Sequence, residues 1–193
     1  MRNVLVSTLT LSLLVACGED AGGPATTLQT LEGTYADPAP YDHGGAFGHR
    51  TFTFDDGAWT LDFVLGLDPA LEAGVFRFRT HGHYEVLRAS PVVPGAFEAL
   101  FVEDAKYVTL LTEDPALAEA FGLAECGLAP GVEKDVSVEG CAGWRPVAEC
   151  AEDHDLLALT AEGGVRFGVR PRDNDMCTAD KRPTALTPAV RRQ

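Results

Sequence analysis

The chain has 193 residues, with 15 Lys and Arg against 29 Asp and Glu, so its formal net charge is −14 at neutral pH. This length fits a single domain, and a hydrophobic share of 46% excludes disorder along the whole chain. The excess of acid, with no run rich in Lys and Arg, excludes nucleic acid as a partner because phosphate backbones repel such a surface.

The first residues are typical of an export signal. Arg2 precedes an apolar stretch from Val4 to Ala16, which is too short to cross about 30 Å of hydrocarbon. The stretch ends in Leu14-Val15-Ala16-Cys17, which resembles the bacterial lipobox, whose Cys receives a lipid before cleavage. We therefore predict a lipoprotein signal peptide at residues 1–16 and a lipid anchor, with palmitate as an acyl chain, on Cys17.

Residues 17–30 are predicted to be a lipidated flexible tether, since they combine Gly, Ala, Thr, Pro and acidic residues without periodicity. Gly18, and not Asp, follows Cys17, which in Gram-negative cells favours the outer membrane. The predicted protein is thus exported and contacts the membrane through its anchor.

Period-two alternation then predicts a series of short strands within one domain, residues 31–190. Residues 55–57 form the turn of the first hairpin, and Gly82 marks a bulge or bend. The predicted strands are residues 51–54, 59–65, 75–84, 97–102, 106–112, 132–138, 155–160 and 164–170.

One short helix interrupts these strands, with Asp114 as its N-cap, Pro115 at its first position and Gly122 as its stop. Residues 171–193 are predicted to be loop and tail. Short strands, turn signals and a one-sided apolar pattern predict an all-β fold, an antiparallel β-barrel-like or strongly curved sheet of lipocalin-like character.

Four cysteines remain beyond Cys17, an even number in an exported chain, which predicts two disulfides. Three pairings are open. We favour the sequential one, Cys126 with Cys141 and Cys150 with Cys177, because it closes local loops. A zinc site is the alternative, but the chain has no C-x-x-C and its spacings match no zinc finger or ribbon.

Polar motifs give little support to catalysis. Beyond residue 17 the chain has only Ser90 and Ser137, neither within G-x-S-x-G, so a serine hydrolase is not predicted. The densest polar cluster runs from Glu149 to Asp155 and includes Glu152, Asp153 and His154; it could carry acid/base chemistry, but a solvated turn is the simpler interpretation. We predict no enzyme and no cofactor.

Histidines do not predict a metal site either. His81 and His83 share one strand face, but Arg77 and Arg79 continue that face and would repel a divalent cation. His43 and His49 flank a Gly-rich segment that lacks the lysine of a phosphate-binding loop.

Aromatic residues recur on the inward faces of successive strands, where they either fill the barrel or enclose an apolar ligand. Periodicity alone favours the filled core. The candidate ligand-binding residues are Phe52, Phe54, Trp59, Phe63, Phe76, Phe78, Tyr84 and Phe167.

A series of short motifs extends from about residue 31 to 190. The motifs are Leu31-Glu32-Gly33-Thr34-Tyr35, Arg50-x-Phe52-x-Phe54 with Trp59, Phe76-x-Phe78-Arg79-x-x-Gly82-x-Tyr84, Glu125-Cys126-Gly127, Gly131-Val132-Glu133-Lys134-Asp135-Val136, Gly140-Cys141, Phe167-Gly168-x-Arg170-Pro171-x-Asp173 and Arg182-Pro183-Thr184-Ala185-Leu186. This series resembles the domain of the adenomatosis polyposis coli down-regulated protein family, which includes Wnt inhibitors.

The resemblance implies a β-barrel-like domain whose large apolar cavity suits an acyl chain, and it supports the Cys126–Cys141 pairing. This chain departs from the family at the first disulfide, because Asp37-Pro38-Ala39-Pro40 stands where the family has its first cysteine, and the partner cysteine is absent near Asp68-Pro69. A Wnt role does not transfer to a bacterial envelope.

We therefore predict a membrane-anchored lipoprotein whose barrel-like module binds an apolar or acylated small ligand. The alternative is a non-catalytic scaffold or interaction protein of the cell envelope with a filled core, which uses its acidic surface to engage a basic partner or divalent cations. The third is an enzyme built on the cluster from Glu149 to Asp155.

Overall fold

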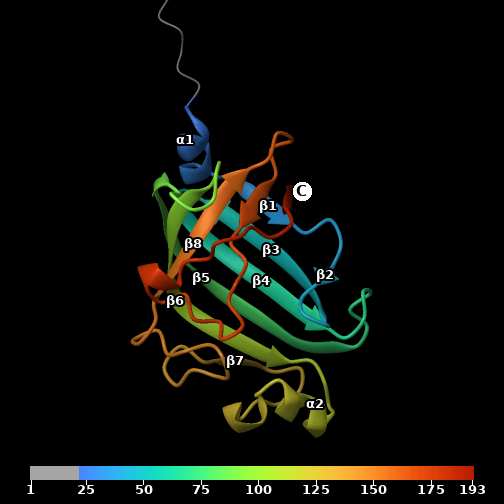
Figure 1. Cartoon of the computed structure of the whole chain (residues 1–193). Helices are drawn as coiled ribbons and strands as arrows, with labels where there is room; N and C mark the ends of the chain where they lie inside the picture. The colour runs from blue at the N-terminus through green and yellow to red at the C-terminus, as the bar shows by residue number, and fades with distance from the viewer. Residues whose placement is uncertain (1–21) are drawn as a thin grey trace, which may run out of the picture.

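A computed structural model describes residues 22–193, so the predicted signal peptide and lipid-bearing Cys17 lie outside the described residues. Residues 22–193 form an antiparallel, nearly closed barrel of ten strands (Figure 1). The strands are β1 (Gly33–Ala36), β2 (Tyr41–Asp42), β3 (Phe47–Asp55), β4 (Ala58–Gly66), β5 (Gly74–Ala89), β6 (Phe97–Leu110), β7 (Glu133–Asp135), β8 (Glu152–Leu159), β9 (Val165–Phe167) and β10 (Arg191–Arg192).

Short helices complete the fold. They are α1 (Pro24–Gln29), α2 (Pro115–Ala120) and the 3-10 turns η1 (Ala124–Cys126) and η2 (Ala179–Lys181). Figure 1 shows α1 at one end of the barrel and α2 at the other. Within residues 22–193, no helix has both the length and the apolar character that a bilayer span requires. The antiparallel strands of residues 22–193 confirm the predicted all-β barrel-like class.

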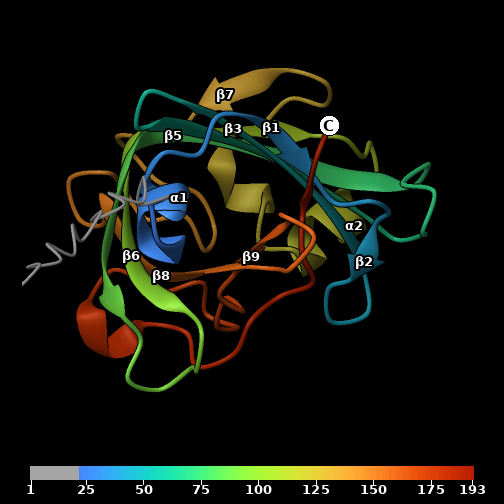
Figure 2. The ribbon, with the colours of Figure 1, turned by 90° about the horizontal axis from the view of Figure 1, so that it is seen from above.

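The sheet follows the order β10-β1-β3-β4-β5-β6-β8-β9, with β2 beside β3 and β7 beside β6. Its two ends meet because Val165 of β9 and Val190 exchange backbone hydrogen bonds of 3.0 and 2.9 Å. From above, the strands form a ring that the C-terminal segment helps to close (Figure 2). The prediction of residues 171–193 as loop and tail is thus wrong in part, since β10 pairs with β1.

A buried ion pair fastens this closing segment to the barrel wall. Arg50 of β3 donates to both carboxylate oxygens of Asp37, with bonds of 3.0 and 2.6 Å. The same guanidinium donates to Thr187 Oγ1 at 2.7 Å and to the carbonyl of Pro188 at 2.9 Å. Because both charges are buried and hydrogen-bonded, the pair holds the C-terminal segment in one position.

The first predicted hairpin is confirmed as β3 and β4. Its turn places Asp56 and Gly57 at φ of 46° and 78°. Positive φ at both central residues is typical of a type I′ turn, and it suits an Asp-Gly pair. The turn therefore sets the register that pairs Phe54 with Trp59.

The predicted bulge at Gly82 is also confirmed. The register of β5 with β6 shifts between His81 and Gly82, and Asp104 is the extra residue on β6. A Cβ atom on Gly82 would overlap the carbonyl oxygen of Val102. Only glycine therefore permits this close approach of the two strands.

The predicted tether ends earlier than residue 30. Residues 24–29 form α1, whose Leu28 has no exposed surface. The hydroxyl of Tyr84 donates to the carbonyls of Leu28 and Gln29, both at 2.9 Å, and accepts from Leu31 N at 3.1 Å. The composition of this segment suggested flexibility, but one apolar side chain and one buried hydroxyl dock it onto the barrel.

At the opposite end, α2 matches its prediction, since the Asp114 carboxylate accepts from Ala116 N at 2.9 Å. The predicted strand at residues 132–138 is wrong in extent, because only Glu133–Asp135 is extended. The Asp135 carboxylate accepts from Ser137 N at 2.8 Å and turns the chain there, and Val138 is exposed.

Candidate functional site

The eight predicted ligand-binding aromatic residues line the interior of the barrel. Phe63 is partly exposed, and the other seven are buried. They divide between two core clusters, one beside α1 and one beside α2. The cluster beside α1 includes Phe52, Phe54, Trp59, Tyr84 and Phe167; the cluster beside α2 includes Phe76, Phe78 and the partly buried Phe63.

These rings pack against each other and against aromatic residues outside the predicted set, among them Phe101 and Trp144. Phe52 and Phe167 stack with ring centroids 3.9 Å apart. Trp59 meets Phe101 edge to face at 4.8 Å, and Phe78 stacks on Trp144 at 4.7 Å. Such separations are those of aromatic pairs in direct contact. The interior of the barrel is therefore occupied by its own side chains at these positions.

Phe101 could have been found in the sequence, since it lies on a predicted strand. Trp144 could not, because it lies in the irregular segment between β7 and β8, without hydrophobic periodicity. The disulfide of Cys126 and Cys141 closes the chain just before Trp144, with an S–S distance of 2.08 Å. The sequential pairing is confirmed in full, since Cys150 and Cys177 are also bonded.

A group of buried charges lies at the point along β6 where its paired strand changes from β8 to β7. β6 pairs with β8 up to Val102 and with β7 from Tyr107 onward. In the gap, Lys106 Nζ lies 2.8 Å from the Glu103 carboxylate and donates to the carbonyl of Cys150 at 2.8 Å. This ion pair joins the barrel wall to the disulfide-bonded segment.

A second pair lies beside it. Arg170 donates to Asp153 at 2.6 Å and to Asn174 Oδ1 at 2.6 Å. Burial raises the pKa of Glu103, and the charge of Asp153 raises it further, while Lys106 opposes both effects. The cavity that these residues line measures about 10 Å³. That volume holds about one water molecule, so a substrate does not fit there. The ionic group instead joins neighbouring segments of the chain.

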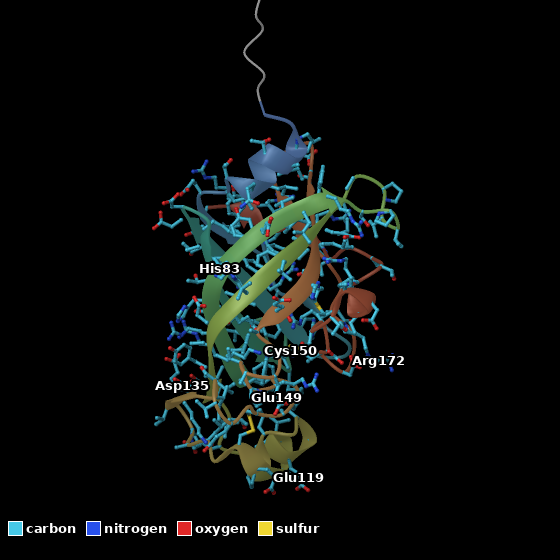
Figure 3. The ribbon with its side chains drawn as sticks, turned by 90° about the vertical axis from the view of Figure 1, so that its left-hand side faces the viewer. His83, Glu119, Asp135, Glu149, Cys150 and Arg172 are labelled. Atoms are coloured by element: carbon cyan, nitrogen blue, oxygen red, sulfur yellow. A yellow bond between two sulfur atoms is a disulfide. The ribbon has the colours of Figure 1, made fainter. Side chains whose placement is uncertain are left out.

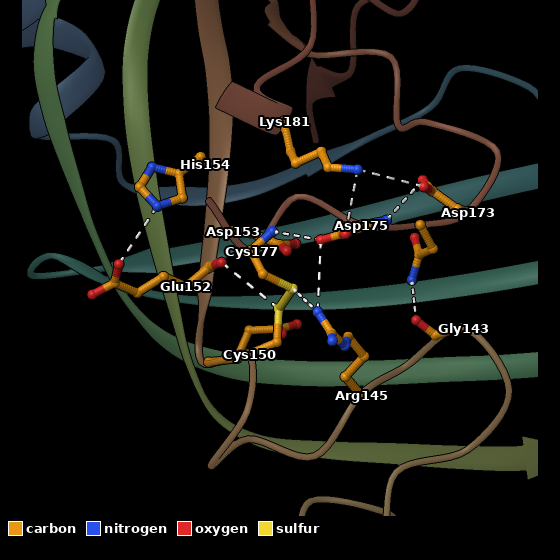
Figure 4. Close-up of a disulfide and its surroundings, with 12 residues drawn as sticks. Gly143, Arg145, Cys150, Glu152, Asp153, His154, Asp173, Asp175, Cys177 and Lys181 are labelled. Atoms are coloured by element: carbon orange, nitrogen blue, oxygen red, sulfur yellow. Dashed lines mark hydrogen bonds and ion pairs between the residues drawn. A yellow bond between two sulfur atoms is a disulfide. The ribbon is translucent and has the colours of Figure 1, made fainter. Parts of the chain in front are cut away.

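The disulfide of Cys150 and Cys177 lies at the edge of this group (Figure 4). Arg145 Nη1 lies 3.9 Å from Asp175, and Lys181 Nζ lies 3.6 Å from the same carboxylate. These surface pairs contribute little free energy individually. Together with the disulfide, they hold the irregular segments that contain Arg145 and Asp175 against the stretch of β6 that lies between its pairings with β8 and β7.

Strand alternation divides the polar cluster from Glu149 to Asp155. Asp153 and Asp155 are buried, whereas Glu149 and Glu152 are exposed and the latter lies 3.5 Å from His154 Nε2. The cluster is thus not one site: Asp153 belongs to the ionic group, whereas the Asp155 carboxylate accepts from the backbone N–H groups of Leu156 and Gly168. The sequence could not show this, because pairing partners decide which face is inward.

The outer face of the barrel carries a hollow of about 220 Å³ over β3, β4, β5 and β6. Its floor includes Thr51, Thr53 and Thr60 from neighbouring strands. Arg77 and Arg79 of β5 line it together with His81, so the predicted face that these three residues share is confirmed. None of the eight predicted aromatic residues lines either the hollow or the small cavity at the ionic group.

His83 lies further along the same outer face and is labelled in Figure 3. Among residues 22–193, no three His, Cys, Asp or Glu side chains come together as a metal site would require. His43 and His49 lie apart from the hollow; His49 Nε2 is 3.0 Å from the carbonyl of Asp37. The side chains that line the hollow are those of arginines, threonines, a leucine, an aspartate, a histidine and a tyrosine.

Neither the comparison with protein-family models nor the search of curated proteins finds a match for this chain. The family resemblance described above therefore depends on the quoted residues alone and stays a prediction.

Proposed function

We propose that this protein is a non-catalytic recognition protein of the cell envelope, which binds its partner through the outer surface of a filled barrel. The observation that carries the proposal is the direct packing of the inward aromatic residues, above all the 3.9 Å stacking of Phe52 on Phe167. A barrel filled to this degree is a rigid scaffold, and recognition then falls to its surface.

Export and anchoring form the second part of the proposal. Two disulfides fit an oxidising, exported environment. We propose that Cys17 carries the lipid and attaches the domain to the outer membrane. Metabolic labelling with palmitate and membrane fractionation test this, since Cys17→Ser should abolish labelling and release the protein from the membrane fraction.

Native mass spectrometry of the exported protein tests the filled barrel. We expect no apolar ligand to copurify and no uptake of added fatty acid. Leu157→Ala provides the positive control, because Leu157 has no exposed surface and its truncation opens an apolar void in the same cluster. This variant should take up a small apolar probe such as benzene.

A stoichiometric acyl ligand on the unmodified protein would overturn the proposal. It would support the other prediction, that the aromatic interior holds an apolar or acylated ligand. Loss of that ligand on replacing Phe78 by Asp, in a variant that stays folded, would then place it in the interior.

A further inference from the structure

Two ion pairs orient the polar groups around the outer hollow. Arg77 Nε donates to Asp62 at 2.8 Å, and the Nη2 atom of Arg77 donates to the second oxygen of the same carboxylate. Arg79 donates to both oxygens of Glu133 at 2.6 and 2.7 Å. Each guanidinium is thus held in a fixed plane by a bidentate contact.

These contacts leave donors available. Both arginines use Nε and Nη2, and among residues 22–193 the Nη1 atom of neither makes a hydrogen bond. Two positive and two negative charges balance at the hollow, so an added anion would meet no net attraction. An uncharged hydroxyl group can accept from Nη1 and donate to a carboxylate at the same time.

Two stacked rings line one side of the hollow. The rings of His81 and Tyr107 lie 6.1 Å apart with an angle of 24° between their planes. Arg79 lies over the Tyr107 ring with its Cζ atom 5.2 Å from the centroid, which holds that ring in place. Amphipathic rings fixed in this way offer apolar surface beside polar groups.

Threonine hydroxyls complete the lining. Thr53 and Thr60 are cross-strand partners on β3 and β4, and Thr51 follows on the same face. A hydroxyl both donates and accepts, so it matches another hydroxyl in either direction. The hollow is below the 300 to 1,000 Å³ that is typical of drug-sized ligands, so it suits one small unit.

We infer that this hollow binds one unit of a neutral saccharide. The unit presents neighbouring hydroxyls to the Arg77–Asp62 pair and the Arg79–Glu133 pair, and its C–H surface packs against the stacked rings of His81 and Tyr107. This inference rests on the proposed function, because it names the ligand class for the outer surface.

Saturation-transfer NMR on the full exported protein tests the inference. The probes are maltotriose, mannotriose, lactose and the trimer of N-acetylglucosamine, each at about 10 mM, a concentration that detects millimolar affinity. At least one should bind. Arg79→Gln and Tyr107→Ala should each raise the Kd for the probe that binds by about tenfold. This is the effect of losing one good hydrogen bond or ring contact.

Arg88→Gln is the matched control. Arg88 lies on the same strand and pairs with Glu98 at 2.9 Å, but it does not line the hollow, so the Kd should stay within about twofold. Thermal unfolding of each variant establishes that the barrel remains folded.

Four results would overturn the inference, and a parallel fatty-acid titration separates it from the proposed function. The first is that no neutral probe binds, and the second is that Arg79→Gln and Tyr107→Ala bind the probe with the same Kd as the unmodified protein. The third is that Arg88→Gln weakens binding as much as these two variants do. The fourth is that the protein prefers inorganic phosphate or glucuronate to the neutral probes. If one of these results is obtained and the protein does not bind fatty acid either, only the saccharide inference fails. Stoichiometric fatty-acid binding would instead overturn the filled barrel, and with it the proposed function.

Discussion

Asp155 of β8 is a buried carboxylate whose removal should change how stability depends on pH. Burial raises its pKa from 3.8 to about 6, although backbone hydrogen bonds from Leu156 and Gly168 oppose the shift. Both bonds, of 2.7 and 2.9 Å, end on Oδ1. An Asn side chain can accept both with its own Oδ1, so Asp155→Asn removes the charge and keeps the hydrogen bonds.

The sign follows from proton binding. Between pH 3.8 and about 6 the folded protein retains a proton on Asp155 that the unfolded chain has lost, so stability falls as pH rises through this range. A shift of about two pKa units corresponds to roughly 3 kcal/mol. Asp155→Asn does not lose stability in this way, because an Asn side chain does not ionise. Its free energy of unfolding relative to the unmodified protein should therefore increase by about 3 kcal/mol from pH 3.5 to pH 7.

Urea unfolding followed by tryptophan fluorescence measures this difference at several pH values. Asp135→Asn is the control with the opposite sign, because hydrogen bonds from the Ser137 side chain and backbone lower the pKa of Asp135. Its relative stability should fall slightly as pH rises toward 3.8. A difference between Asp155→Asn and the unmodified protein that stays constant with pH would refute the reasoning.

Three further predictions concern stability. Reducing the Cys150–Cys177 disulfide, which spans 27 residues, should cost about 3 to 4 kcal/mol in chain entropy; equal urea midpoints for the oxidised protein and Cys150→Ser/Cys177→Ser would contradict this. Gly82→Ala should lower the free energy of unfolding by at least about 2 kcal/mol through its clash with Val102, whereas Gly163→Ala, with open space around it but positive φ, should cost only about 1 kcal/mol. Tyr84→Phe removes the hydroxyl that holds α1 and should cost about 1 to 3 kcal/mol. Hydrogen exchange should then accelerate at Leu31, and unchanged protection there would exclude this role of the hydroxyl.

The sequence predicted those features of the fold that depend on residues close together in the chain. The turn at Asp56 and Gly57, the bulge at Gly82 and the cap at Asp114 each depend on a few neighbouring residues, and all three are observed. The sequential disulfides likewise close short loops. The all-β class followed from alternation together with the turn signals between the strands.

Long-range contacts were not predictable in this way. Leu28 is buried because a barrel end lies beneath it, not because its own segment has a pattern. The C-terminal segment becomes part of the wall because Arg50, distant in sequence, binds Thr187. At the outer hollow, the shared face of Arg77, Arg79 and His81 was predicted, but Glu133 and Tyr107 come from strands whose register the sequence does not reveal.

The barrel joins its first strand to its last, since Gln193 N donates to the carbonyl of Thr34 at 2.9 Å. During synthesis, one edge of β1 therefore stays unpaired until residues 191–193 have been added. Contacts of such separation slow folding, and the waiting edges are prone to pair with other chains. Deleting residues 190–193 would remove Val190 and β10 together, and would leave one edge of β1 open to pairing with other chains.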